Sequence, residues 1–440
     1  MGNFFQTIRN AWKIPDLKKR LIYTFVLLMI FRIGCSIPIP GVSASTLAGV
    51  FGGQSNGIFG FLNIISGNAM KNFTIFAMSI TPYINSSIII QLLTVAIPAL
   101  ERLAKDGGEE GKKKLGQISR YTTVGLALFQ AFFLAYNLRG SFEIKPTWFA
   151  IVLVMAALTA GTSFLMWLGE QITDKGIGNG ISLLIFAGIV SNGPQVVSSL
   201  YNTFIINKDM NIAVGLLYIA LILVLFTALI ALVIYITEAE RKIPVQYAKR
   251  VVGRKMYGGQ STVIPIKINA SGVLPIIFAM SILAFPSTII SLFFPNATGG
   301  FVDGLKNFGG TVWYPIINGV LVIGFTFFYS AVFFNPKEIS DNLKDNGGFI
   351  PGIRPGKPTT DFIKSVSNKT TMAGALFLAL ITVMPTALQF ILTQINSAAF
   401  GALNLWFGGT SVLIMVGVAL ETVKQIESYM LARYYKGFLE

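Results

Sequence analysis

The sequence lacks histidine altogether and has a single cysteine, Cys35, in 440 residues. The absence of histidine excludes imidazole as a general base and as a metal ligand. One thiol can form neither an internal disulfide nor a cysteine-based metal cluster. We therefore expect no catalytic residue, no metal site and no cofactor.

Charged residues are also scarce, at 12% of the chain against 53% hydrophobic residues. This balance excludes a large soluble core and is typical of a polytopic membrane protein. The first apolar run is not followed by a small-residue cleavage site, so we expect it to be retained as a membrane span rather than removed as a signal peptide.

Long uncharged apolar runs, bounded by charges or by glycine, proline and asparagine, predict ten transmembrane helices. The predicted fold class is thus an all-α polytopic membrane protein. The ten runs cover approximately residues 21–39, 73–97, 121–138, 148–168, 177–197, 212–236, 268–294, 312–334, 372–395 and 403–420. These spans carry almost no charge, which argues against an ion-coupled transport mechanism because ionisable residues inside membranes usually mark such relays.

Most of the 34 lysine and arginine residues fall in the tails and in alternate loops. The positive-inside rule therefore places both termini in the cytoplasm. The net charge of +15 makes that face a candidate docking surface for an acidic partner or RNA, although in the short loops the charges could serve only to set the topology. Two loops, 238–264 and 336–371, are longer than a tight connection needs and show no strong secondary-structure pattern, which favours a functional role.

The stretch from Gly57 to Leu93 is typical of a broken membrane helix. Its first apolar piece, Ile58 to Ile65, is too short to cross a bilayer, and Ser66, Gly67 and Asn68 interrupt it. Irregular backbone at membrane depth is tolerated where protein buries it or water reaches it, so this piece indicates a cavity or pore. A re-entrant loop used only for packing is the alternative.

Two further patterns concern the organisation of the chain. The hexapeptide IFAMSI occurs at residues 75–80 and again at 277–282, which is where a duplicated five-span unit would place its counterpart, although one hexapeptide could be coincidence. The sequence GIGNG at 176–180 begins like a dinucleotide fingerprint but has no strand before it. We expect a tight turn between helices there.

Five motifs occur in the order found in one known family: SITPYINSSIIIQLL (79–93), MWLGEQITDKGIGNGISLLIFAGIV (166–190), EAERKIPVQYAKR (238–250), GGFIPGIRPG (347–356) and FGGTSVLI (407–414). Together they resemble the SecY family of bacterial protein-conducting channels, over essentially the whole chain. The resemblance implies two pseudo-symmetric five-helix halves around a central hourglass pore with a lateral opening. The division would be a cytoplasmic tail (1–20), a first half (21–207), a second half with the two long loops (208–422) and a C-terminal tail (423–440).

The resemblance also assigns residues to three sites. The pore ring would consist of Ile80, Ile84, Ile185, Ile189, Ile277 and Ile414. The plug would consist of Phe61, Leu62, Asn63, Ile64, Ile65, Ser66, Gly67, Asn68, Ala69 and Met70. Docking of a motor or ribosome would use Arg241, Lys242, Lys249, Arg250, Arg354 and Lys357. Two ring pairs are four residues apart and so share a helix face, an arrangement that ordinary helix packing would also produce.

The function implied is that of a channel which moves unfolded secretory polypeptides across the bacterial cell membrane and releases transmembrane segments sideways into the lipid bilayer. Such a subunit is not an enzyme, because a separate motor hydrolyses ATP. The implied partners are the membrane subunits SecE and SecG, the motor ATPase SecA, the ribosome and secretory preproteins. The alternative is a secondary transporter with a broken-helix substrate site.

Overall fold

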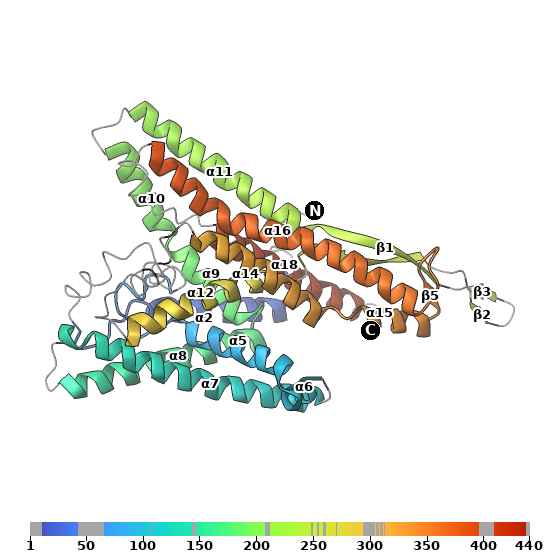
Figure 1. Cartoon of the computed structure of the whole chain (residues 1–440), viewed down its shortest axis with the longest axis horizontal. Coiled ribbons are helices and arrows are strands. Elements are labelled where there is room, and N and C mark those ends of the chain that lie inside the picture. Colours follow the sequence, from blue (N-terminus) through green and yellow to red (C-terminus); the bar gives the residue numbers. More distant parts are fainter. Residues whose placement is uncertain are drawn as a thin grey trace. The chain divides into compact units, whose positions relative to one another are not determined.

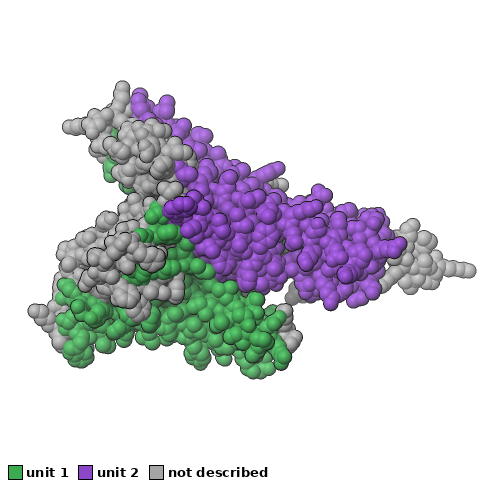
Figure 2. All heavy atoms as spheres, viewed as in Figure 1, with its two compact units in different colours: residues 1–208, 281–311, 418–440 green, residues 209–280, 312–417 purple. Residues whose placement is uncertain are grey.

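The computed structural model divides the chain into two compact units, which Figure 2 shows in different colours. Unit 1 comprises residues 1–208, 281–311 and 418–440, and unit 2 comprises residues 209–280 and 312–417. The structure describes residues 11–42, 66–105, 107–142, 147–206, 212–247, 250–252, 255–257, 261–269, 271–293, 304, 308, 311, 313–395 and 409–436.

Unit 1 is built from helices. In chain order they are α2 (Pro15–Gly34), α5 (Thr81–Ala96), α6 (Pro98–Lys105), α7 (Gly108–Asn137), the short η1 (Arg139–Ser141), α8 (Thr147–Lys175), α9 (Gly180–Ser191), α10 (Gly193–Tyr201) and the π-helical η2 (Asn202–Ile206). Helix α7 packs against both α5 and α8 (Figure 1). Ala127, Ala131 and Ala135 recur every four residues along α7, and all are buried in a core cluster with Val154 and Leu158 of α8. Small residues at this spacing let two helix backbones approach closely, as membrane helices commonly do.

The second apolar piece of the predicted broken helix begins later than expected. The second apolar piece was expected to be helical from residue 73, but residues 66–80 form turns and α5 begins at Thr81. Pro82 explains the late start, because proline is tolerated in the first turn of a helix and not in its interior. The turns are not left unpaired: Ile39 N donates to Phe73 O (3.1 Å) and Ile75 N donates to Ile37 O (3.1 Å).

Unit 2 contains α11 (Ile212–Glu238), α14 (Trp313–Phe333), α15 (Pro336–Asp345) and α16 (Lys357–Ile395). Two more helices, α12 (Leu274–Phe293) and α18 (Gly409–Lys436), contribute residues to both units. Helices α14 and α16 pack along each other (Figure 1). At that contact, a side chain at Gly319 of α14 would lie 3.3 Å from a methyl carbon of Val383, so glycine sets the spacing of the pair.

Unit 2 also contains β-structure, which corrects the prediction of an all-α chain. Strands β1 (Glu240–Tyr247), β4 (Ser261–Lys267) and β5 (Gly348–Phe349) form an antiparallel sheet in the order β4-β1-β5, and β2 (Arg250–Val252) pairs with β3 (Lys255–Tyr257). The physical reason is an alternating pattern in β1, where Ile243 and Val245 are buried and the residues beside them are exposed.

Six described helices are long and apolar enough to cross a membrane, or seven if α5 and α6, bent by 105°, count as one broken span. All ten predicted apolar runs overlap a described helix, but α2, α12 and α18 fall outside those six. The fold is therefore mostly helical, and the number of ten spans stays a prediction. The division into two five-helix halves, 21–207 and 208–422, also stays a prediction.

Candidate functional site

Four of the predicted ring residues lie in unit 1, as two pairs. Ile80 precedes the first turn of α5, and Ile84 N donates to Ile80 O (3.1 Å), so the two side chains are one helical turn apart. Ile185 and Ile189 are likewise one turn apart in α9. All four are buried, with 8% or less of their surface exposed. Each pair therefore has the local geometry that the four-residue spacing predicts.

The other two ring residues lie in unit 2, on the helices α12 and α18. Ile277 and Ile414 are both buried, and Ile276 beside Ile277 is fully buried. A side chain at Gly417, one turn beyond Ile414, would meet Val273 at 2.8 Å, so α12 begins close against α18. The structure thus places all six isoleucines in buried positions, four in unit 1 and two in unit 2. Their meeting at one constriction stays a prediction.

Polar contacts fix the position of α9 at its start. The predicted interhelical turn at 176–180 is present, with Gly178 in the left-handed region at φ +86°. Asn179 caps α9 by accepting from Ser182 N (3.2 Å), and Gly180 N donates to Thr173 Oγ1 of α8 (2.9 Å). Ile177 N donates to Thr24 Oγ1 of α2 (3.0 Å). The turn therefore holds α9 against two other helices of unit 1.

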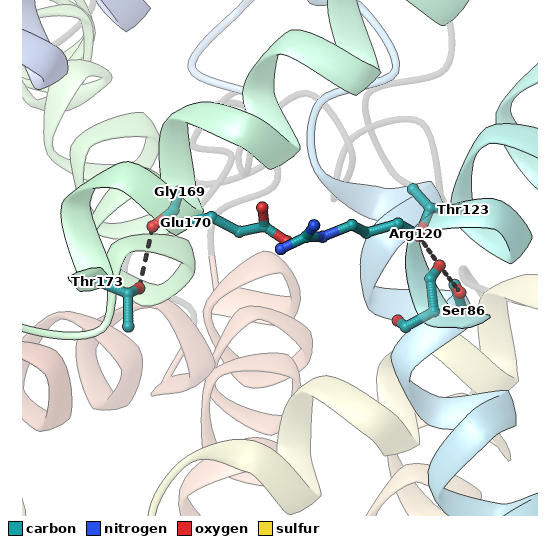
Figure 3. Close-up of polar contacts among 7 residues, drawn as sticks. Ser86, Arg120, Thr123, Gly169, Glu170 and Thr173 are labelled. Atoms are coloured by element: carbon teal, nitrogen blue, oxygen red, sulfur yellow. Dashed lines mark hydrogen bonds and ion pairs between the residues drawn. The ribbon is translucent and has the colours of Figure 1, made fainter. Parts of the chain in front are cut away.

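A second set of polar contacts joins α5, α7 and α8 (Figure 3). The buried Ser86 of α5 donates to Ser119 O of α7 (2.8 Å). The next residue of α7, Arg120, forms an ion pair with Glu170 of α8, with 2.7 Å between Nε and Oε1. Because Thr173 on the same helix binds the start of α9, the helices that carry the two isoleucine pairs are connected through α7 and α8.

The structure describes only the second half of the predicted plug, residues 66–70. Phe61, Leu62, Asn63, Ile64 and Ile65 lie outside the described residues, as does the short apolar piece expected at 58–65. The remaining five, Ser66 to Met70, form turns and are largely buried. Side chains of α2 and α10 contact this segment.

The two long loops predicted for docking fold into one small body. The sheet β4-β1-β5 packs with α15 and the start of α16 around a cluster of buried apolar side chains, Ile243, Val245, Ile266, Leu343, Ile350 and Ile363. Arg241, Lys242, Arg354 and Lys357 are exposed on this body. Lys249 lies outside the described residues, and Arg250 lies in β2. Two loops that are far apart in the sequence therefore present their basic residues from one folded unit.

Two buried hydroxyl groups hold the backbone of residues 352–357, a basic tip that carries Arg354 and Lys357, and sequence reasoning missed them. Thr359 Oγ1 donates to Arg354 O (2.8 Å), and Ser340 Oγ donates to Gly356 O (3.0 Å). Gly352 and Gly356 adopt left-handed conformations, with φ of +81° and +97°. The tip is consequently a defined structure. The sequence offers one usable signal for it, the glycines on either side of Arg354.

The family model described as SecY matches residues 74–423. A protein translocase subunit SecY from Streptomyces coelicolor is 43% identical over 447 residues, covering 98% of each chain.

In the part of the chain that the structure describes, no group of three acidic, histidine or cysteine side chains could hold a metal ion.

Two solved structures share the fold. A protein-conducting channel aligns with a TM-score of 0.61 and 20% identity, covering 93% of this chain and 91% of that one. Sec61 from the canine ribosome–channel complex of the endoplasmic reticulum aligns with a TM-score of 0.57 and 18% identity, with the same coverage. The extent of the family match and the identity over nearly the full length leave one conclusion, that the chain belongs to the SecY family.

Proposed function

We propose that the chain is the central channel subunit of a bacterial Sec translocase, which moves unfolded secretory polypeptides across the cell membrane and releases transmembrane segments into lipid. The observation that carries the geometric part of this proposal is the burial of all six predicted ring isoleucines, four of them in one-turn pairs. The chain is a translocase subunit and not an enzyme, in keeping with the names of its relatives.

Branched aliphatic side chains suit a channel that must seal against ions and still pass a polypeptide. A narrow apolar neck loses its water and so stops ions. It also offers a passing chain no strong hydrogen bond that would hold it back. In this proposal the six isoleucines form the neck, residues 61–70 form a plug, and the lateral opening lies beside the spans that contain α5 and α12.

The proposed topology has ten spans in two five-helix halves, with both termini in the cytoplasm. The distribution of basic residues supports this orientation, because most of them lie in the tails and in alternate loops. The folded body that carries Arg241, Lys242, Arg354 and Lys357 then faces the cytoplasm.

The proposed partners of this body are the motor ATPase SecA and the ribosome. Its exposed arginines and lysines suit an acidic protein surface or RNA. A structural neighbour, canine Sec61, was solved in a ribosome–channel complex, which supports the ribosome as a partner. SecE and SecG are proposed as membrane partners on the family resemblance alone. A secondary transporter is the weaker alternative, because the predicted spans carry almost none of the ionisable residues that couple transport to ions.

Polar substitution of the ring tests the proposal. Replacing Ile185 and Ile189 with serine should let the resting channel conduct ions, since polar groups lower the cost of wetting the neck. Valine at the same positions should leave the neck closed because it stays aliphatic. Serine at Ile222 and Leu225 of α11 is the matched control, since neither residue is predicted to line the ring.

Ion conductance of the purified channel in planar bilayers is the measurement. The proposal predicts conductance from the serine ring variant alone. Equal conductance from ring and control variants, or none from the ring variant, would show that these isoleucines only pack. A crosslink between an arrested secretory chain and a ring position provides the second test, because a transporter of small solutes would not form it.

A further inference from the structure

The segment Ser66–Met70 lies against three helices of unit 1 in an uncommon backbone conformation. Gly67 and Asn68 are both in the left-handed region, with φ of +62° and +70°. Left-handed asparagine is tolerated because its short polar side chain bonds locally, but two such residues in succession persist only where neighbours hold them. Ser66 and Ala69 are fully buried, and Met70 is buried in the core cluster of unit 1.

Side chains from two helices reach this segment. Arg32 of α2 donates through Nη1 to Gly67 O (3.3 Å), and Cys35 Sγ lies 3.6 Å from Ser66 O. From α10, Gln195 Oε1 accepts a hydrogen bond from Asn68 Nδ2 (2.7 Å). An arginine inside a predicted span is costly and is usually retained for function. Here its guanidinium group binds the backbone of the segment that the plug prediction includes.

The third contact is with the end of α9, beside the ring residue Ile189. A side chain at Gly67 would lie 2.7 Å from Ser191 Oγ and 3.2 Å from the Cα of Gly188, so only glycine fits this approach. Gly188 directly precedes Ile189 in α9. The segment is thus seated on the same helix end that carries one of the buried isoleucines.

We infer that Arg32 and Gln195 form a polar latch that holds Ser66–Met70 against the end of α9 and so keeps the resting channel closed. This inference rests on the proposed channel function. The latch is releasable because its contacts are hydrogen bonds, and the one between Asn68 and Gln195 is exposed, so water can replace it at little cost. The chain after Met70 is fixed differently, by burial of Phe73 and Ala77 in the core.

Variants at Gln195 and Asn68 test the latch in the purified channel with its membrane partners, reconstituted in planar bilayers. Loss of one neutral hydrogen bond should raise the resting ion conductance about fivefold in Gln195→Ala and in Asn68→Gly, since glycine keeps the left-handed conformation at residue 68. The double variant should conduct no more than either single variant, because both remove the same contact. Gln195→Glu keeps an acceptor oxygen and should conduct like the unaltered channel. Arg32→Gln removes a charged donor and should raise conductance at least tenfold.

The controls distinguish a latch that closes the channel from contacts that only stabilise the fold. Ser198→Ala, on the exposed side of the same helix α10, should leave conductance unchanged. Because Gln195 is exposed, its replacement should not change the temperature of unfolding, whereas a merely structural role would lower stability and closure together. Unchanged conductance in Gln195→Ala and Asn68→Gly, or additive effects in the double variant, would overturn the latch.

The result is also distinguishable from failure of the channel function. Ile189→Ser is measured in parallel under the same conditions. If Ile189→Ser conducts and the Gln195 and Asn68 variants do not, the latch is wrong and the channel stands. If none of the variants conducts and no polypeptide is translocated, the proposed function itself fails, and the latch fails with it.

Discussion

Replacing Gly161 with alanine tests how α8 positions the turns that lead into the first ring pair. Gly161 is a buried residue of α8, and the chain at Ile75 passes directly over it. An added Cβ would lie 2.0 Å from Ile75 O, 2.9 Å from the carbonyl carbon and 3.3 Å from a ring carbon of Phe76. Ordinary van der Waals contact begins near 3.4 Å, so the Ile75 backbone would have to move by about 1.4 Å.

The effect of this movement on the free energy of unfolding has two opposing contributions. Overpacking of a closely packed core typically costs about 1–3 kcal/mol. Alanine is favoured over glycine in a helix by about 1 kcal/mol, which offsets part of that cost. We expect a net destabilisation of up to about 2 kcal/mol. Since Ile80 is five residues beyond Ile75, the same movement should also disturb the ring and raise ion conductance at rest.

The matched control is Gly125→Ala on α7, because a Cβ there meets nothing within 4 Å. This change should leave stability unaltered or increase it by up to about 1 kcal/mol. Thermal unfolding of the detergent-purified protein and bilayer conductance are the two assays. If the Gly161 and Gly125 variants behave alike in both, the close approach of Ile75 to α8 is refuted, and with it our account of how Ile80 is positioned.

Two further predictions concern the basic body of unit 2. Arg354→Glu should abolish motor-driven translocation without changing stability, because Arg354 is exposed and its side chain is free to meet a partner of opposite charge. Lys364→Glu is the control, since Lys364 is also exposed. Unimpaired transport in the Arg354 variant would contradict the docking role. Ile363→Ala should destabilise this body by about 2–5 kcal/mol, because Ile363 is fully buried in its apolar cluster. Limited proteolysis of the loops should detect this, while Leu376→Ala, exposed on the same helix, should have no effect.

Hydropathy located the helices well but not their ends. Every predicted apolar run overlaps a described helix, because an uncharged run of this length has few alternatives to a helix in a membrane. The ninth run was expected to begin at residue 372, whereas α16 begins at Lys357. The intervening turns of α16 are polar and cover the folded body of unit 2. Hydropathy reports contact with lipid, so a helix that continues into water is cut short in the prediction.

The sheet of unit 2 was missed although β1 carries a signal. Ile243 and Val245 alternate with exposed residues, but Pro244 between them lowers the expectation of a strand, and the preceding residues are charged. Pro244 pairs with Val263 of β4, whereas β5 pairs only with Gln246 and Tyr247, so at Pro244 strand β1 lies at the edge of the described sheet, where proline is tolerated. Strand β5 has only two residues, so no periodicity could reveal it.

The contacts that position the predicted ring and plug residues are of two kinds, those within one helix and those between residues far apart in the sequence. The pairs Ile80/Ile84 and Ile185/Ile189 follow from a four-residue period within one helix, and the sequence predicts them correctly as neighbours. The bonds from Arg32 to Gly67 and from Asn68 to Gln195 join residues 35 and 127 positions apart.

No pattern in one sequence encodes such distant pairings, and motif resemblance assigns parts without saying how they are joined. The end of α9 supplies that connection, because Gly188 lies against Gly67 of the predicted plug and Ile189 belongs to the predicted ring. A force that lifts residues 66–70 must therefore act on the same turn of helix as one that widens the ring. Displacing the segment and opening the neck should accordingly be coupled steps rather than independent ones.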